Sequence, residues 1–498
     1  MFDFEKSRKK IMELDALEEK RIEEIRNTES DLSKITGKLI YVSESEGCDD
    51  NDGLSEKTPL KSIRNATMLA ESGDGVLLKR GDMWRANFTA KSGITYSAYG
   101  KGAKPVICGS PKNGACADDW FLVYENKDTG ALIWQYRNTA MTDVGAIFFN
   151  DGEGWGRKEL PACDGERFVC KEDKSKEYDM REGLDADLKF FHAANSIVCG
   201  KEIDAQTSTG PLYLRCDSGN PGEVFQSIEN VARSHMFYVG QNKGVKIDNL
   251  CIKYVGMHGV AAGMYVDDLT VTNCEFGWIG GTIQHYFGLD PNYPEGGRGT
   301  VTRFGNAIEV YGGCKNYTVS DNYIYEVYDA GITHQVTTRT KLSMSDIRYE
   351  NNLIENCVYG IEYFLDQIDG ESESCMDNVI IKTNFIRNSG YGWGQQRHNK
   401  HTPAAIKGWS YVNTAKNYSI TNNIFDRCAY RLLHLVALEK TSLAYMDGNT
   451  YIQHLNGKIG QYGENKIKEP ENITFDMNAD NVISDVFGDK NSKVYYID

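Results

Sequence analysis

A short unit of polar and apolar residues recurs through the second half of the chain. Each copy has a polar residue, usually Asn, followed by two variable residues and then Ile or Phe. The copies are NLCI at 249, NCEF at 273, DNYI at 321, NNLI at 351, TNFI at 383, NNIF at 422 and NTYI at 449. They begin 24, 48, 30, 32, 39 and 27 residues apart, and this self-similarity is typical of a repeat protein. The shortest interval predicts one coil, and the longer intervals predict a coil with an insertion or, at 48 residues, two coils.

The residue types of this unit predict strands that stack in register. In a parallel β-solenoid, each coil places its strands on those of the coil before it, about 4.8 Å away. Equivalent side chains then form ladders, so stacked Asn amides satisfy one another at a turn while Ile and Phe fill the interior. The units are rich in Val, Ile, Thr and Tyr and lack a long 3.6-residue period, which argues against a helical solenoid. The sequence therefore predicts an all-β fold, a parallel β-helix.

Residues 1–36 predict a helix of a different character. Dense charges of both signs surround an apolar stripe formed by Ile11, Leu14, Ile22 and Ile25. Because the open end of a stacked sheet exposes unpaired strand edges, we expect this helix to act as an N-terminal cap. A coiled-coil contact with a partner is the alternative.

The rest of the chain divides by pattern. Residues 37–114 predict the first β-helix coils, with a short helix near 62–72. Residues 115–235 break the repeat with strand-like runs among charged loops, and predict a β-rich insertion that either shapes a cleft or mediates homo-oligomer formation. Residues 236–498 predict the main β-helix, with the functional face and a C-terminal cap.

Charge narrows the choice of partner. The 498 residues contain 55 Lys and Arg against 71 Asp and Glu, and the net charge of −16 repels nucleic acid and anionic membranes. A neutral oligosaccharide is the easier substrate to reconcile with this charge. The first residues alternate in charge where a secretory signal needs an apolar core, and no apolar run reaches about 18 residues. We therefore expect a cytoplasmic protein without a membrane span.

The cysteines and histidines give little indication of a metal. The 13 cysteines are scattered singly with no C-x-x-C pair, which in a cytoplasmic chain indicates reduced, buried thiols. His398 and His401 form an H-x-x-H, a weak signal by itself. Phosphate loops, dinucleotide fingerprints and nucleophile elbows are absent from the sequence. We expect neither a metal nor another cofactor.

The candidate chemistry follows from aligning one strand of five neighbouring coils: GNAIEVY (305–311), DAGITHQ (329–335), YGIEYF (359–364), AAIKGW (404–409) and YRLLHL (430–435). One apolar residue of each then fills the interior: Ile308, Ile332, Ile361, Ile406 and Leu433. The residues that follow them form a column on the outer face: Glu309, Thr333, Glu362, Lys407 and His434. Asp329 has the same outward parity, at the turn before its strand.

Three acids on one outer face predict acid–base catalysis. Glu309 and Glu362 are two coils apart, about 9.6 Å, with Asp329 on the coil between them. The outer pair suits an inverting glycosidase, which needs about 6.5–9.5 Å, and neighbouring coils suit a retaining one, which needs about 5–5.5 Å. Mutual repulsion would keep one carboxyl protonated. We expect Asp329 and Glu362 to be the catalytic pair and Glu309 a third acid or hydroxyl binder; the alternative is a turn residue and two solvated charges.

The segment GYGWGQQR supplies candidates for substrate binding. Tyr391 and Trp393 have rings that suit the CH face of a sugar, and Arg397 would orient a hydroxyl or a carboxylate. Trp393 is the expected sugar platform, although covering a loop would explain it equally well.

Three further residues complete the predicted binding set. His258, in MHGV, either acts as a base or hydrogen-bonds a turn, and Lys407 belongs to the outward column. His334 has interior parity, which favours a buried, hydrogen-bonded histidine that supports Asp329 from below.

Two regions resemble the right-handed parallel β-helix proteins that act on carbohydrates. The runs GCDDNDGLSEKTPLKSI, GDGVLLKRGDMWR and GITYSAYGKGAKPVI carry this likeness, as do GNAIEVY, YDAGITHQ, GIEYF and GYGWGQQR, over residues 39–455. The group includes polygalacturonases, β-xylosidases, lacto-N-biosidases, pectate lyases and uronan epimerases. The resemblance implies a right-handed β-helix and, for a hydrolase, two carboxylates on its outer face, which in this sequence match only Glu309, Asp329 and Glu362.

The resemblance leaves the reaction open. The polygalacturonase pattern N-x-D, DD and GHG is not matched in order, because His258 and its glycine precede the acids. We expect a glycosidase that cleaves short, neutral oligosaccharides. A uronan lyase or epimerase is the alternative, with Lys407, Arg397 or His434 as base or carboxylate partner. A non-catalytic sugar-binding solenoid is the second alternative.

Overall fold

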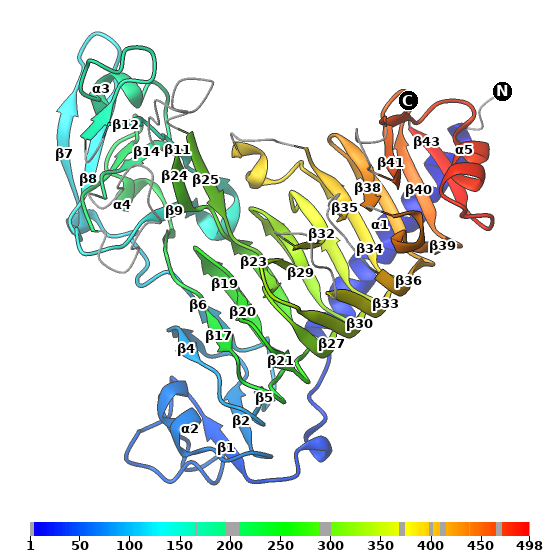
Figure 1. The fold of residues 1–498 in the computed structure, drawn as a ribbon. Helices are drawn as coiled ribbons and strands as arrows, with labels where there is room; N and C mark the ends of the chain where they lie inside the picture. Colours follow the sequence, from blue (N-terminus) through cyan, green and yellow to red (C-terminus); the bar gives the residue numbers. More distant parts are fainter. Residues whose placement is uncertain are drawn as a thin grey trace.

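The chain winds into a stack of coils that share three long parallel sheets (Figure 1). The computed structural model describes residues 4–164, 167–194, 209–287, 300–367, 374–397, 402–408, 415–437, 439–464 and 471–497. Neighbouring strands pair in parallel along the sheets, and β41 and β42 at one edge pair antiparallel. The predicted parallel β-helix is confirmed.

From β2 to β41, each coil contributes one strand to each sheet, while β1 precedes the first of these coils and β42 and β43 follow the last. Sheet A contains β1 (Leu39–Val42), β2 (Gly75–Lys79), β5 (Thr95–Tyr99), β18 (Lys246–Asp248), β22 (Thr270–Thr272), β27 (Cys314–Ser320), β30 (Ser343–Glu350), β33 (Cys375–Lys382), β36 (Ala415–Thr421) and β39 (Tyr445–Asp447), with β21 (Val266–Asp267) beside β27. Sheet B contains β3 (Met83–Arg85), β6 (Val106–Cys108), β19 (Cys251–Val255), β23 (Glu275–Ile279), β28 (Tyr323–Val327), β31 (Leu353–Glu355), β34 (Phe385–Ser389), β37 (Ile424–Cys428), β40 (Thr450–His454) and β43 (Lys493–Ile497). Sheet C contains β4 (Phe88–Thr89), β17 (Phe237–Gly240), β20 (Val260–Ala262), β26 (Ile308–Val310), β29 (Ala330–Thr338), β32 (Tyr359–Gln367), β35 (Ala404–Gly408), β38 (Arg431–Ala437), β41 (Lys458–Glu464) and β42 (Ile473–Thr474).

The first two positions of the repeated unit have separate roles. The first is a turn residue with φ between 52° and 62° in six copies: Asn249, Asn273, Asp321, Asn351, Thr383 and Asn422. Asn and Asp tolerate this left-handed backbone better than most residues, which explains their recurrence. The second is a buried ladder in which each amide donates to the next side-chain oxygen at 2.9–3.1 Å: Asn322, Asn352, Asn384, Asn423 and Asn449.

The last copy is out of step with the sequence pattern by one residue. Asn449 belongs to the ladder, and Gly448, with a φ of 70°, takes the turn position. Tyr451 therefore pairs with the interior Phe425, where the pattern placed Ile452. A ladder of amides sets the register more strongly than the identity of the apolar residue, since buried amides must be paired.

The predicted N-terminal helix is present as α1 (Phe4–Asn27), and it lies along sheet B rather than over an end of the stack (Figure 1). Arg26 pairs with Glu275 of β23, Asp15 pairs with Arg387 of β34, and Ser7 contacts β43. These contacts lie on three widely separated coils, so the helix covers a face of sheet B across much of the stack.

Two short helices cover the ends of the interior. Ile63 and Ala66 of α2 (Ile63–Leu69) are buried against the first coils, and Ala479 and Ile483 of α5 (Ala479–Val486) are buried against the last ones. All four side chains belong to the continuous apolar core of the β-helix. Within the described ranges, the helices are too short or too polar to span a membrane.

The β-rich insertion has sheets of its own. One contains β10 (Gly154–Trp155), β9 (Val144–Phe149) and β16 (Ile228–Ala232), and another contains β11 (Arg157–Lys158), β14 (Lys189–His192), β15 (Leu212–Arg215), β8 (Leu132–Tyr136) and β7 (Trp120–Glu125). A hairpin of β12 (Ala162–Asp164) and β13 (Arg167–Val169) and two helices, α3 (Met180–Gly183) and α4 (Pro221–Val224), complete it. Figure 1 shows these elements beside the hairpin formed by β24 (Thr282–Phe287) and β25 (Thr300–Phe304), at one side of the stack.

Candidate functional site

The outward column of sheet C aligns as the sequence predicts. The interior ladder is Ile308, Ile332, Ile361, Ile406 and Leu433, paired in register from β26 to β38. Thr333, Glu362, Lys407 and His434 pair in register beside it. Toward the earlier coils, the column continues from Glu309 to Ala261 and Tyr238. Glu309, Thr333, Glu362, Lys407 and His434 are all buried despite facing outward.

Glu309 accepts hydrogen bonds from three side chains. Thr333 Oγ1 donates to it at 2.7 Å, Gln335 Nε2 at 3.1 Å, and Asn306 Nδ2 donates to the same oxygen. Burial raises the pKa of Glu309, these hydrogen bonds oppose the rise, and the charge of Glu362 adds to it. The carboxyl is therefore fixed in place by donors yet disposed to hold a proton.

Asp329 forms an ion pair with Arg397, which lies 68 residues later in the sequence. Burial raises the pKa of Asp329 to about 6, the Arg397 cation opposes this rise, and the charge of Glu362 reinforces it. Near neutral pH this carboxyl can thus both hold and release a proton.

Glu362 forms an ion pair with Lys407 on the next coil. Lys407 Nζ lies 3.3 Å from Glu362 Oε1 and 3.9 Å from the ring centroid of Tyr359. The Arg397 guanidinium lies 5.6 Å from the same centroid, so this ring contacts a cation from each of the two ion pairs. Because Ala330 pairs with Tyr359, Asp329 is offset from Glu362 along the strands as well as by one coil. Asp329 lies opposite Val358, four residues before Glu362 on the neighbouring strand, so their backbone positions are about 13 Å apart along the strand direction.

His434 continues the column beyond Lys407 as an uncharged ring. Burial and the nearby Arg431 and Lys407 lower the pKa of His434 to about 3. Its Nδ1 is buried and has no hydrogen-bond partner among the described residues. His434 is therefore a weak base at neutral pH.

Trp393 is not a sugar platform, because its side chain is 0% exposed. It begins a short 3₁₀ helix, η4 (Trp393–Gln396), and its Nε1 donates to Glu326 O at 2.7 Å. The ring centroid lies 5.1 Å from both Phe148 of the insertion and Tyr328 of the solenoid. Trp393 instead anchors the loop that carries Arg397 between these two parts of the protein.

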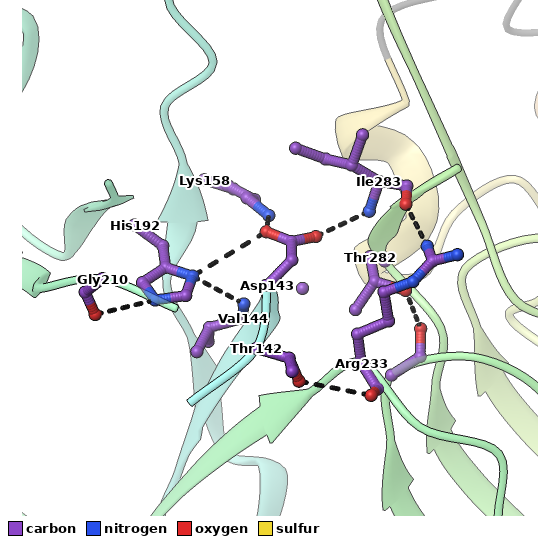
Figure 2. Close-up of polar contacts among 12 residues, drawn as sticks. Thr142, Asp143, Val144, Lys158, His192, Gly210, Arg233, Thr282 and Ile283 are labelled. Carbon is purple, nitrogen blue, oxygen red and sulfur yellow. Dashed lines mark hydrogen bonds and ion pairs between the residues drawn. The ribbon is translucent and has the colours of Figure 1, made fainter. Parts of the chain in front are cut away.

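A buried charge cluster joins the insertion to the hairpin and to this loop. Figure 2 shows Lys158 and His192 on one side of the Asp143 carboxylate and Ile283 on the other. Asp143 pairs with Lys158 and accepts a hydrogen bond from the Ile283 N–H at 2.7 Å, and His192 Nδ1 lies 3.9 Å from it. Burial disfavours the charged form of Asp143, yet Lys158 and His192 hold the pKa of this carboxyl below its usual range, while burial lowers the pKa of Lys158 to about 8.

Hydrogen bonds between the backbone of the insertion and the Gln396 side chain connect this cluster to the loop that carries Arg397. The Lys158 N–H donates to Gln396 Oε1 at 3.3 Å, and Gln396 Nε2 donates to Gly156 O at 3.1 Å. Gln396 directly precedes Arg397, so the insertion holds the segment from which Arg397 reaches Asp329.

His334 lies in the solenoid interior, where it cannot bind substrate. Its Nδ1 hydrogen-bonds Tyr349 at 2.9 Å, its Nε2 hydrogen-bonds Tyr418 at 3.2 Å, and its ring stacks on Tyr363 at 5.3 Å. The expected buried, hydrogen-bonded histidine is confirmed, but its partners are tyrosines and not Asp329. Alternation along the strand explains this, because Asp329 faces outward.

The other predicted binding residues fall in different places. Tyr391 is 46% exposed, and partial burial raises the pKa of its phenol; none of its described contacts involves the three acids. His258 lines a cleft of about 460 Å³ together with Glu309. His398 and His401 lie outside the described residues. Within those ranges, no three His, Cys, Asp or Glu side chains are grouped so as to hold a metal ion.

Sequence reasoning missed several residues that shape the site. Gln335 has the outward parity of Thr333, so alternation could have found it. Asn306 lies at the turn before β26, and Tyr359 is the first residue of β32, outside the aligned column. His235 enters the cleft from the end of the insertion.

The chain matches no family model. It is 26% identical over 277 residues to a lacto-N-biosidase of Bifidobacterium longum subsp. longum, and the match covers 49% of this chain and 17% of that protein. Among solved structures, the complex of XylC with xylose has 12% identity and a TM-score of 0.42, covering 92% of this chain and 82% of that one. A lacto-N-biosidase from Eubacterium ramulus has 12% identity and a TM-score of 0.33, covering 93% and 69%. The resemblance to carbohydrate-active proteins noted in the sequence agrees with the curated match.

Proposed function

We propose that the protein is a glycoside hydrolase that uses Asp329 and Glu362 on the outer face of sheet C, with Glu309 as a third acid. One observation carries the proposal: three buried carboxylates lie on three consecutive coils, Glu309 and Glu362 within sheet C and Asp329 directly before β29. The charge of Glu362 raises the pKa of both others. The 26% identity to a protein named as a lacto-N-biosidase supports the same class of reaction.

Glycoside hydrolysis needs one carboxyl that delivers a proton and one that is ionised. Asp329, with a pKa of about 6, suits the proton donor. Glu362, in its ion pair with Lys407, suits the nucleophile or the base that activates water. Glu309, held by three donors, suits a position beside a sugar hydroxyl.

Short, neutral oligosaccharides are the favoured substrates. The net charge of −16 disfavours an anionic polysaccharide at long range. Arg397 and Lys407, the cations nearest the acids, are both ion-paired with them. A uronan lyase or epimerase would need such a cation for the substrate carboxylate, so this alternative is less well supported.

A product assay tests the proposal. The protein is incubated with a panel of 4-nitrophenyl glycosides, neutral oligosaccharides and polygalacturonate. New reducing ends without an ultraviolet-absorbing unsaturated product support a hydrolase. An unsaturated product identifies a lyase, and binding without turnover of any substrate identifies a sugar-binding solenoid.

A further inference from the structure

The spacing of the coils gives the cleft beside Glu309 room for about one sugar ring. In the column of sheet C, Ala261 lies between Tyr238 and Glu309, so only a methyl group separates a phenol from a carboxylate two coils away. Two strand spacings are about 9.6 Å. A ring in van der Waals contact on both faces needs about 7–8 Å between the flanking atoms. Ala262 and Gly263 line the cleft beside Ala261.

Aromatic rings form one wall of this cleft. The His235 and His258 rings stack at 5.0 Å with an interplanar angle of 11°, and the Tyr238 ring lies 6.0 Å from His235. The Phe304 ring packs edge-on against His258 at 5.2 Å. Tyr238 is 49% exposed, so its ring is available for stacking.

The two histidines present hydrogen-bond donors to the cleft. The backbone N–H of His258 donates to the ring Nδ1 of His235 at 3.3 Å, and the backbone N–H of Asn306 donates to the ring Nδ1 of His258 at 3.0 Å. Burial lowers the pKa of both rings to about 3, so they are neutral and carry their proton on Nε2. Both rings line the cleft, and in the described part of the chain no hydrogen bond joins either Nε2 to another residue.

We propose that this cleft is a subsite for one neutral pyranose unit, which stacks on Tyr238 and accepts hydrogen bonds from His235 and His258. The assignment rests on the proposed glycosidase function and places part of the substrate on the earlier coils, next to Glu309. Arg233, the cation at the wall, already donates to Ile283 O and lies 5.2 Å from the Phe304 ring centroid. Glu309 in the same cleft disfavours a uronate.

Sugar titrations of the full chain test the subsite directly. Histidine ring signals are followed by NMR during titration with xylose, galactose, glucose, N-acetylglucosamine and galacturonate. We expect saturable binding of a neutral sugar to the wild-type protein. Binding to Tyr238→Ala should be about tenfold weaker. Ala261→Leu, whose larger side chain fills the cleft, should not bind. Tyr445→Ala, which removes a 62% exposed tyrosine on sheet A, is the matched control and should bind as wild type does.

Three results would overturn the subsite: no saturable binding of any neutral sugar, unchanged binding to both cleft variants, or preference for galacturonate. Kinetics separate this failure from failure of the proposed function. If an oligosaccharide is hydrolysed with the same KM by wild type and both cleft variants, the subsite is wrong and the glycosidase stands. If the cleft variants lose sugar binding but wild type hydrolyses no glycoside, the subsite stands and the proposed function is wrong.

Discussion

Arg397 is ion-paired with Asp329, and the insertion holds the loop from which Arg397 extends. Lys158, which belongs to the buried charge cluster with Asp143, hydrogen-bonds Gln396. Gln396 directly precedes Arg397, the cation beside the proposed catalytic acid Asp329. Of the two roles considered for the insertion, shaping the site is the one these contacts support.

Replacing Arg397 with Gln should raise the pKa of Asp329 above about 6, because the cation that opposes the effect of burial is lost. The pH dependence of kcat/KM reports this change as an upward shift of the apparent pKa near 6. Arg348→Gln, which removes a half-exposed arginine on β30, should leave the profile unchanged. Identical profiles for Arg397→Gln and wild type would show that the apparent pKa near 6 does not belong to Asp329.

Replacing Asp143 with Asn should lower the free energy of unfolding by about 3–5 kcal/mol, because the buried Lys158 loses its counter-charge. Denaturant unfolding measures this loss, and activity should fall with it as the η4 loop loosens. The double variant Asp143→Asn/Lys158→Met removes the unpaired charge and should regain part of the stability. A single variant as stable and active as wild type would contradict the bridging role.

Replacing Thr383 with Asn should raise the free energy of unfolding by about 1 kcal/mol, because a β-branched residue is strained at a φ of 56°. Asn or Asp occupies this turn position in five of the other copies. The reverse change one coil earlier, Asn351→Thr, should destabilise by a similar amount. Equal stability of all three proteins would show that the turn tolerates branching.

Stability should depend on pH through Glu18, whose pKa burial and the neighbouring Glu355 raise from 4.5 to about 8. Between these values the folded protein binds this proton and the unfolded chain does not, so the group stabilises fully below about pH 4.5 and progressively less as pH rises to about 8. Glu18→Gln removes this dependence. The difference in Tm, variant minus wild type, should therefore grow from pH 5 to pH 8, and a constant difference would contradict the assignment.

Stacking made the solenoid predictable, whereas contacts between distant segments were not. Ile332 and Ile361 repeat at equivalent positions, so their alignment also placed Thr333 beside Glu362. Trp393 was misassigned because its burial depends on Phe148, in an insertion that has no repeat. The shift at Gly448 escaped detection for a related reason: the turn accepts Gly or Asn, and the sequence offers both in succession.

The same distinction applies to the site. Outward parity identified Glu309 and Glu362, because alternation along a strand is fixed by its geometry. The cleft at Ala261 arises because this small side chain lies between Tyr238 and Glu309 on the two flanking coils, and no sequence motif indicates such a gap. Likewise, α1 has the amphipathic pattern of a cap, but that pattern fits any apolar surface, and the helix packs on sheet B.

The most direct test of the central claim is the hydrolysis rate of Asp329→Asn and Glu362→Gln on the 4-nitrophenyl glycoside that wild type cleaves fastest. Glu350→Gln, a half-exposed glutamate on sheet A, is the matched control. We predict that each acid variant folds and loses about 10²–10⁴-fold in kcat, while the control keeps the wild-type rate. Full activity in both folded acid variants would contradict the claim that these carboxylates perform the reaction.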